Sequence, residues 1–266
     1  MTVVYEKKDH IATVRINRPE AKNALDPETV VALAKAWVDF RDDNDMRVAI
    51  VTGTGDSFCS GADLGKLIPL ITGARQPETE ADHAIQADPT LSQKALLREF
   101  ELWKPVIAAV NGYAIAGGCE LMQATDIRVA SETAKFGLQE VKWAIFPMGG
   151  SSARLPRQIP FCRAMEMLLT GDLIDARTAH AIGFVNHVVP PDQVLGKAEE
   201  IAKKISANGP LAVKAIKQAV IENLGLTVKD ALAHELELAM PVFMSRDARE
   251  GPRAFKEKRP PKYEGR

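Results

Sequence analysis

The segment from Pro105 to Glu120 combines residue types whose spacing suits acid–base chemistry beside an anion site. Its apolar start predicts a buried strand, and Asn111-Gly112 predicts a tight turn. The glycine pair Gly117-Gly118 then opens a helix, whose first backbone N–H groups lack helical partners and lie at the positive end of the dipole. Such N–H groups suit an oxygen that becomes negative during a reaction. Glu120 follows one turn later, where its carboxyl can shuttle a proton.

A second segment repeats the pattern of a strand followed by a glycine turn. Arg47–Thr52 predicts a buried strand that enters the turn Gly53-Thr54-Gly55, and the loop Phe58–Leu64 follows. The turn completes neither a dinucleotide fingerprint nor a P-loop. Two strands that each lead to a glycine turn and a candidate ligand loop favour an α/β fold with a repeated unit.

The elements before residue 104 are expected from local signals. Residues 2–17 predict two short strands joined at a charged tip, and Asp26-Pro27 marks a helix start, because Asp caps and Pro suits the first turn. Residues 73–90 are polar and contain two prolines, which indicates a loop or loose helix able to move over a site. Thr90–Trp103 is expected to be a helix.

Beyond residue 120 the pattern changes from mixed to helical. Strands are expected at 126–130, 134–139 and 184–189. Three helices are expected between them: one that begins after Pro147–Gly150, one over Cys162–Leu169 and a short one capped by Asp175. Helices are expected at 191–207, 210–223, 227–244 and 246–259. We therefore expect an α/β part at residues 1–190 that carries the site, and a helical region at residues 191–266.

Composition limits the classes of partner. The 34 basic and 35 acidic side chains give a net charge of −1, so nothing indicates binding to nucleic acid or to an acidic membrane. The three cysteines argue against a disulfide framework and for a reducing, cytoplasmic compartment. No spacing suggests a metal site, no apolar run approaches the roughly 20 residues of a membrane span, and the charged first ten residues do not predict a signal peptide.

Taken together, the motifs resemble the crotonase superfamily, also called the enoyl-CoA hydratase/isomerase family. The matching stretches follow the family's order along nearly the whole chain: 17–19, 22–25, 58–64, 105–120, 126–130, 136–140, 147–150, 169–171, Gly183 and 255–259. The resemblance implies a spiral of repeated β-β-α units followed by a helical trimerisation region. It also implies a homo-oligomer, either a trimer or a dimer of trimers.

The resemblance also implies the catalytic groups. The backbone N–H groups of Ala62 and Gly117 would form the oxyanion hole, and Glu120 and Glu140 match the two glutamates of the hydratase pattern. Taken alone, Ser60-Gly61-Ala62-Asp63 is a surface turn, and a Glu in a first helical turn is favoured simply by the dipole. Because members with other activities often lack one or both glutamates, their joint presence favours addition of water.

The remaining candidates concern coenzyme A, which is expected only as part of the substrate, with no separate cofactor. The resemblance assigns it to residues from three parts of the chain: Lys22, Ala24 and Leu25, then Ala62, Asp63 and Leu64, then Phe255 and Lys258 reaching into a neighbouring subunit's site. Without the resemblance, Lys258 would be interpreted as a solvated charge in a basic tail. One departure is Met148, where hydratases of the family often have glycine, and it puts the acyl preference in question.

Other nucleophile patterns are weaker. Cys119 has no local base to activate it and is interpreted as a packing residue. No serine lies in a Gly-x-Ser-x-Gly elbow, and of the histidines only His83 lies in the stretch expected near the site. The sequence therefore predicts an enoyl-CoA hydratase of fatty-acid or related β-oxidation. The alternatives are a Δ3-Δ2-enoyl-CoA isomerase or acyl-CoA thioester hydrolase on the same fold, and a non-catalytic CoA-binding protein.

Overall fold

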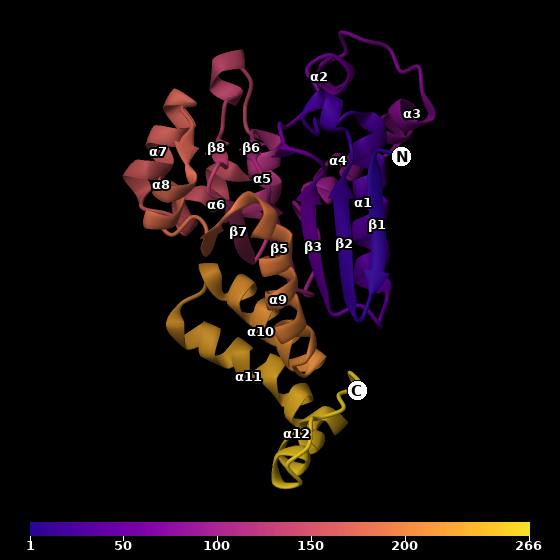
Figure 1. Ribbon diagram of the computed structural model, residues 1–266, viewed down its shortest axis with the longest axis vertical. Coiled ribbons are helices and arrows are strands. Elements are labelled where there is room, and N and C mark those ends of the chain that lie inside the picture. Colours follow the sequence, from indigo (N-terminus) through magenta and orange to yellow (C-terminus); the bar gives the residue numbers. More distant parts are fainter.

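A six-stranded sheet in the order β1-β2-β3-β5-β7-β10 forms the body of the molecule (Figure 1), and a computed structural model describes all of residues 1–266. β1 and β2 form an antiparallel hairpin, and every later neighbour in this sheet is parallel. Its strands are β1 Val3–Lys8, β2 Ile11–Ile16, β3 Val48–Gly53, β5 Val106–Val110, β7 Ile127–Ser131 and β10 His187–Val189.

A smaller sheet runs in the order β4-β6-β8-β9, and its strands alternate along the chain with those of the larger sheet. They are β4 Ser57–Cys59, β6 Tyr113–Ile115, β8 Lys135–Gly137 and β9 Ile174–Asp175. β3, β5 and β7 therefore each lead directly into β4, β6 and β8, so that corresponding strands of successive units pair in parallel. This repetition confirms the predicted spiral of β-β-α units.

Helices complete each unit and cover the sheets. The helices before residue 191 are α1 Pro27–Asp42, α2 Leu67–Ile71, α3 Glu80–Ala87, α4 Thr90–Ala95, α5 Gly117–Gln123, α6 Ser151–Gln158, α7 Phe161–Thr170 and α8 Ala176–Ala181, with 3-10 turns at Pro19–Ala21 and Glu140–Trp143. The Asp26 side chain caps α1 by accepting from the Thr29 N–H at 3.0 Å, as the Asp-Pro pair predicts.

The larger sheet is buried on both faces. Along β3, Ala49 and Val51 belong to the main apolar core, whereas Val48 and Ile50 face a second cluster against helix α9 (Val194–Ser206). Helices on both faces explain why the central strands read as continuous apolar runs in the sequence. α9 begins after residue 190 yet packs on the sheet (Figure 1), and the division of the chain into two regions at that residue stays a prediction.

The last helices lie below the sheet, away from the smaller sheet (Figure 1). They are α10 Pro210–Glu222, α11 Val228–Met244 and α12 Arg246–Lys256, with 3-10 turns at Pro191–Gln193 and Asn223–Gly225. α10 and α11 pack on each other, but large apolar side chains on both remain exposed. No helix in the structure has the length and apolar character that crossing a membrane requires.

Two predicted elements are shorter in the structure: the strand expected over 184–189 is confined to β10 at His187–Val189, and the helix expected over Thr90–Trp103 ends early. The helix expected over Thr90–Trp103 is wrong beyond Ala95, because Leu97 adopts a left-handed φ of 52° and the Arg98 N–H returns to the Gln93 carbonyl at 2.8 Å. Such a turn ends a helix. The stretch 73–90, expected to be a loop or loose helix, contains both: residues 80–87 form α3, whose Thr79 and Asp82 make a full capping box.

Candidate active site

A cavity of about 1300 Å³ lies between the two glycine-rich segments and the helices α2 to α4. Most of the predicted site residues line it: Ala24, Leu25, Ala62, Asp63, Leu64, Gly117, Glu120 and Glu140. Residues more than 100 positions apart therefore meet at one concave surface, which is the usual form of a small-molecule site.

The backbone pairing of Leu25 with Ala62 leaves the Ala62 N–H free to bind a ligand. Leu25 forms an isolated parallel bridge with Ala62: the Leu25 N–H donates to the Gly61 carbonyl at 2.8 Å, and the Asp63 N–H donates to the Leu25 carbonyl at 2.9 Å. Because consecutive N–H groups of an extended chain alternate in direction, the Ala62 N–H points away from Leu25. Gly117 is the first residue of α5, so its N–H has no acceptor within the helix.

The two amides lie next to each other because the backbone segments touch. A Cβ added to Gly117 would lie 3.6 Å from the Ala62 nitrogen, and one added to Gly61 would lie 3.0 Å from the Gly117 nitrogen. A Cβ on Gly118 would lie only 2.1 Å from the Cys59 carbonyl oxygen. Gly61 and Gly118 are thus required for the close approach of α5 to β4, whereas a Cβ on Gly117 would make only an ordinary contact. Ala116 takes a strained φ of 49° where α5 begins.

Glu120 is buried beside the start of α6. Its side chain is 3% exposed, and its Oε1 accepts from the Ser151 N–H at 3.2 Å. Burial raises the pKa of Glu120, while N–H groups of Gly149 and Ser151 and the charge of Arg154 oppose that rise. Gly149 has room for no side chain, since its Cβ would lie 2.6 Å from Glu120 Oε2.

Glu140 lies in the same cavity but in a poorer environment for charge. It is 5% exposed, and its Oε2 has no hydrogen-bond partner. Burial, with a contribution from the charge of Glu120, raises the pKa of Glu140 to about 7. The two carboxyls therefore interact, and their environments differ: Glu120 receives N–H donors that favour its ionised form, and Glu140 Oε2 receives none.

The candidate coenzyme A residues separate into two groups. Ala24, Leu25, Asp63 and Leu64 line the cavity, whereas Lys22 does not and instead pairs with Asp56 at 2.9 Å. Phe255, at the end of α12, is 87% exposed, and neither it nor Lys258 lines the cavity of its own chain. Their predicted place in a neighbouring subunit's site stays a prediction.

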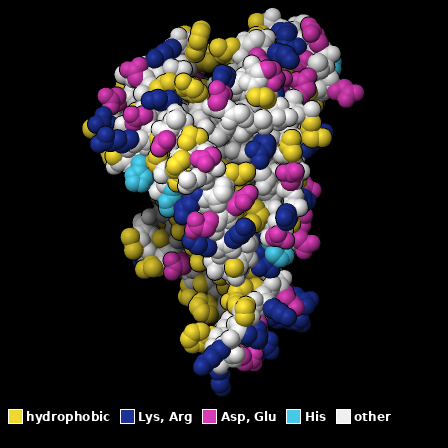
Figure 2. All heavy atoms as spheres, in the orientation of Figure 1, with side chains coloured by type: hydrophobic (Ala, Val, Ile, Leu, Met, Phe, Trp, Pro, Cys, Tyr) yellow, Lys and Arg dark blue, Asp and Glu magenta, His cyan; other side chains and the backbone are white.

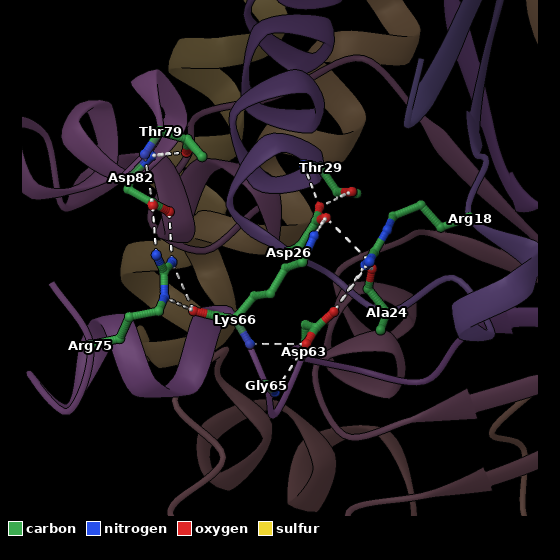
Figure 3. Close-up of polar contacts among 10 residues, drawn as sticks. All are labelled: Arg18, Ala24, Asp26, Thr29, Asp63, Gly65, Lys66, Arg75, Thr79 and Asp82. Atoms are coloured by element: carbon green, nitrogen blue, oxygen red, sulfur yellow. Dashed lines mark hydrogen bonds and ion pairs between the residues drawn. The ribbon is translucent and has the colours of Figure 1, made fainter. Parts of the chain in front are cut away.

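A network of ion pairs and hydrogen bonds around Arg18 and Asp63 holds the loop that follows Ala62 (Figure 3). Arg18 donates to the Ala24 carbonyl at 2.5 Å and to Asp63 Oδ2 at 3.2 Å, and pairs with Asp26 at 3.2 Å. Asp63 Oδ1 in turn accepts from the N–H groups of Gly65 and Lys66. Arg18 belongs to the family motif, but its partners cannot be predicted from local sequence, because Asp63 lies 45 residues away.

The second cluster in Figure 3 holds the polar stretch 73–90 through Arg75, Thr79 and Asp82. Asp82, buried in the first turn of α3, accepts from both terminal nitrogens of Arg75 at 2.8 Å, and this ion pair lowers the pKa of Asp82. Leu67 and Ile85, from α2 and α3, line the cavity. The bidentate pair thus joins the residues before α3 to the helix that borders the site.

Three further residues that the sequence singles out, Cys119, His83 and Met148, differ in their place relative to the cavity. Cys119 is fully buried, and burial raises the pKa of its thiol to about 12, as expected for a packing residue rather than a nucleophile. His83 is exposed and does not line the cavity. Met148 does line it, with its side chain 65% exposed and its carbonyl accepting from Arg98.

Fold and site together define an α/β protein of the crotonase type. The sequence pattern of the enoyl-CoA hydratase/isomerase family matches residues 6–266, so the chain belongs to that family. The chain is 45% identical to "Enoyl-CoA hydratase EchA19" of Mycobacterium tuberculosis, over 98% of this chain and 96% of that protein. It is 40% identical to "(E)-benzylidenesuccinyl-CoA hydratase" of Thauera aromatica, over 100% of both. A solved enoyl-CoA hydratase of Mycobacterium tuberculosis superposes with a TM-score of 0.89 at 40% identity, covering 100% and 99% of the two chains.

Proposed function

We propose that this chain is an enoyl-CoA hydratase, which adds water across the 2,3 double bond of a trans-2-enoyl-CoA thioester. The observation that carries the proposal is the meeting of two buried carboxyls, Glu120 and Glu140, with the adjacent amides of Ala62 and Gly117 in one cavity. The relatives named as hydratases, at 45% and 40% identity, support the same activity.

The two amides would bind the thioester oxygen. As water adds at C3, enolate charge grows on that oxygen, and fixed N–H donors stabilise the transition state more than the substrate. Backbone donors suit this task because the Leu25–Ala62 pairing and the α5 start hold them in place before the substrate arrives. Loss of one such donor typically costs roughly 10²–10³ in rate.

We assign activation of the water to Glu120 and protonation of C2 to Glu140. The assignment is supported by their environments: Glu120 receives the Ser151 N–H, which favours a carboxylate, whereas the pKa of Glu140 is about 7. A pair of acids whose pKa values are pushed apart supplies a base and an acid at one pH. Because they interact, they titrate as a coupled pair.

The substrate's coenzyme A would bind along the same cavity. Ala24, Leu25, Ala62, Asp63 and Leu64 would contact the pantetheine arm and adenine of the substrate's coenzyme A, with Lys22 near by. No other cofactor is needed, because hydration involves no change of oxidation state overall. We place the reaction in cytoplasmic β-oxidation of fatty acids or related acyl groups.

We also propose that the chain assembles as a trimer or a dimer of trimers. Leu232, Leu236, Met240 and Phe243 lie on one face of α11 and are 49% to 73% exposed. Yellow side chains gather over this lower part of the molecule in Figure 2. An apolar face of this kind is typical of an interface. In such an assembly Phe255 and Lys258 would reach a neighbour's coenzyme A.

The test is incubation with a panel of enoyl-CoA thioesters in ¹⁸O-labelled water, followed by mass analysis. Hydration predicts label on C3; a shifted double bond without label would mean an isomerase, free acid a hydrolase, and unchanged thioester a binding protein. Glu120→Gln and Glu140→Gln should each lower turnover by roughly 10²–10⁴, the usual contribution of general acid–base catalysis, while leaving CoA binding nearly unchanged. Near-normal hydration by both variants would rule the mechanism out.

A further inference from the structure

Negative charges outnumber positive ones among the side chains that line the cavity. The charged side chains are Asp63, Arg98, Glu120 and Glu140, so Arg98 is the single cation among them. Asp63 is already paired with Arg18, and the two glutamates are assigned to the chemistry. Nothing in the proposed hydration requires the guanidinium of Arg98. A positive charge inside an acyl-CoA site therefore calls for a separate explanation.

Arg98 is held by the loop that packs against Glu120. Its Nη1 donates to the Met148 carbonyl, and the next residue, Gly149, packs against the Glu120 carboxylate, where its Cβ would lie 2.6 Å from Oε2. The other terminal nitrogen pairs with Glu99 at 3.2 Å, but the Glu99 side chain is 65% exposed. The guanidinium is thus oriented by a backbone carbonyl, while its one carboxylate partner is a solvated residue that a ligand can replace.

The backbone around Arg98 is strained. Leu97 and Glu99, on either side of it, adopt left-handed φ values of 52° and 49°. A bulky residue such as leucine rarely takes this conformation, and it is retained mainly where the surrounding structure holds a functional residue in place. Burial of the Leu97 side chain in the core fixes the turn. The end of α4 is therefore built to direct Arg98 toward the cavity wall.

The neighbouring wall is mixed, with polar side chains between apolar ones such as Ile85 and Leu96. Gln86, Ser92 and Gln93, from α3 and α4, line the cavity, and Ser92 and Gln93 are partly buried. A plain alkyl chain packed against these groups would remove their hydration without offering hydrogen bonds, which is unfavourable. An acyl group that carries its own hydrogen-bond acceptors suits these polar groups better, and its methylene groups suit the apolar ones.

We propose that Arg98 binds a carboxylate on the acyl group, so that the preferred substrates are trans-2-enoyl-CoA thioesters of dicarboxylic acids; this inference rests on the proposed hydratase function. A planar guanidinium binds a carboxylate through two parallel N–H···O bonds. The carboxylate takes the place of Glu99, while the bond to the Met148 carbonyl keeps the guanidinium oriented. Arg98 is a specificity residue and takes no part in the addition of water.

The experiment compares two substrates of the same shape. One is 5-carboxypent-2-enoyl-CoA, and the other is 6-methylhept-2-enoyl-CoA, in which an isopropyl group replaces the carboxylate. The readout is the ratio of their kcat/KM values, because a general loss of activity cancels in it. Wild-type protein is compared with Arg98→Gln, with Arg98→Lys and with Lys94→Gln. Lys94 is the matched control: it lies on α4, pairs with Asp88 at 3.2 Å and does not line the cavity.

Wild-type protein should prefer the carboxylate substrate. Hydrogen bonds to charged groups contribute enough that Arg98→Gln should lower the ratio by roughly 10- to 100-fold, Arg98→Lys should lower it less, and Lys94→Gln should leave it unchanged. Equal ratios in wild type and Arg98→Gln, or a wild-type preference for the isopropyl substrate, overturn the inference while leaving the hydratase proposal standing. Hydration of neither substrate, nor of any thioester in the panel, refutes the hydratase proposal and this inference with it.

Discussion

At the scale of single residues, the proposed chemistry depends on the difference between two glutamates that share one cavity. Glu120 accepts an N–H from the α6 start, and Glu140 leaves an oxygen without a partner. Identical side chains therefore differ in how readily each holds a proton. The difference comes from the backbone donors supplied at residues 149–151, which no inspection of the glutamates alone would reveal.

The first prediction concerns the pH dependence of activity. If Glu140 must be protonated to deliver a proton to C2, kcat/KM should fall as pH rises above about 7, the pKa of Glu140 in the free protein. Ionised Glu120 is needed as the base, so activity should also fall on the acid side. Measurement of kcat/KM from pH 5 to 9 checks this, and a profile that stays flat to pH 9 contradicts the assigned roles.

The second prediction concerns the free energy of unfolding. The pKa of Glu140 rises from 4.5 to about 7 on folding, so the native protein holds the proton more tightly, and stability falls as pH rises through that window. Glu140→Gln removes this cost. At pH 8 it should be more stable than wild type by on the order of 3 kcal/mol, from about 1.36 kcal/mol per pKa unit.

Denaturant unfolding at pH 8 and pH 4.5 measures this difference. Near pH 4.5 the gain should vanish, because the Glu140 carboxyl is then largely protonated in the native protein. Glu6→Gln, at an exposed position on β1, is the control and should change stability by less than about 0.5 kcal/mol at either pH. A Glu140→Gln variant that is less stable than wild type at pH 8 would show that burial does not disfavour the ionised carboxyl of Glu140.

At the scale of elements, the site exists because α5 lies directly on β4. Gly118 is the contact point, since its Cβ would lie 2.1 Å from the Cys59 carbonyl oxygen. Gly118→Ala should therefore destabilise the protein by about 3 kcal/mol and displace the Gly117 amide, lowering activity. Gly196→Ala is the matched control, because that glycine lies within α9 with nothing within 4 Å.

The control should behave in the opposite way. Replacing an unhindered glycine in a helix raises helix propensity, so Gly196→Ala should increase stability by about 0.5–1 kcal/mol. Thermal or denaturant unfolding of both variants, with hydration rates, provides the comparison. Equal stability of the two variants would mean that the α5–β4 contact is looser than described.

Much of the element pattern could be predicted from local signals. The β1–β2 hairpin, the Asp26 cap of α1 and the strand-to-turn pattern before Gly117 all depend on residues near one another in the chain. The end of α4 could not be predicted, because apolar periodicity continues past residue 95 while the turn at Leu97 is fixed by burial in the core. The ion pairs of Arg18 could not be predicted either, because Asp26 and Asp63 become its neighbours only on folding.

At the scale of the whole molecule, the helices after residue 206 leave an apolar face uncovered. Leu232, Leu236, Met240 and Phe243 recur at helical spacing along α11. If this face forms the proposed assembly, Leu236→Asp should shift the mass in sedimentation toward that of one chain, because burial of a charge opposes association. Glu6→Lys, on the edge strand β1, should leave the mass unchanged, whereas a monomeric wild-type protein would contradict the proposed oligomer.

The most direct test of the central claim is a crystal structure with a bound 3-hydroxyacyl-CoA, the expected product. We expect the thioester oxygen to lie about 2.7–3.1 Å from both the Ala62 and the Gly117 nitrogen. We also expect the 3-hydroxyl to lie within hydrogen-bond reach of Glu120 and Glu140. A thioester oxygen bound away from either amide, or a hydroxyl that neither glutamate contacts, would contradict it.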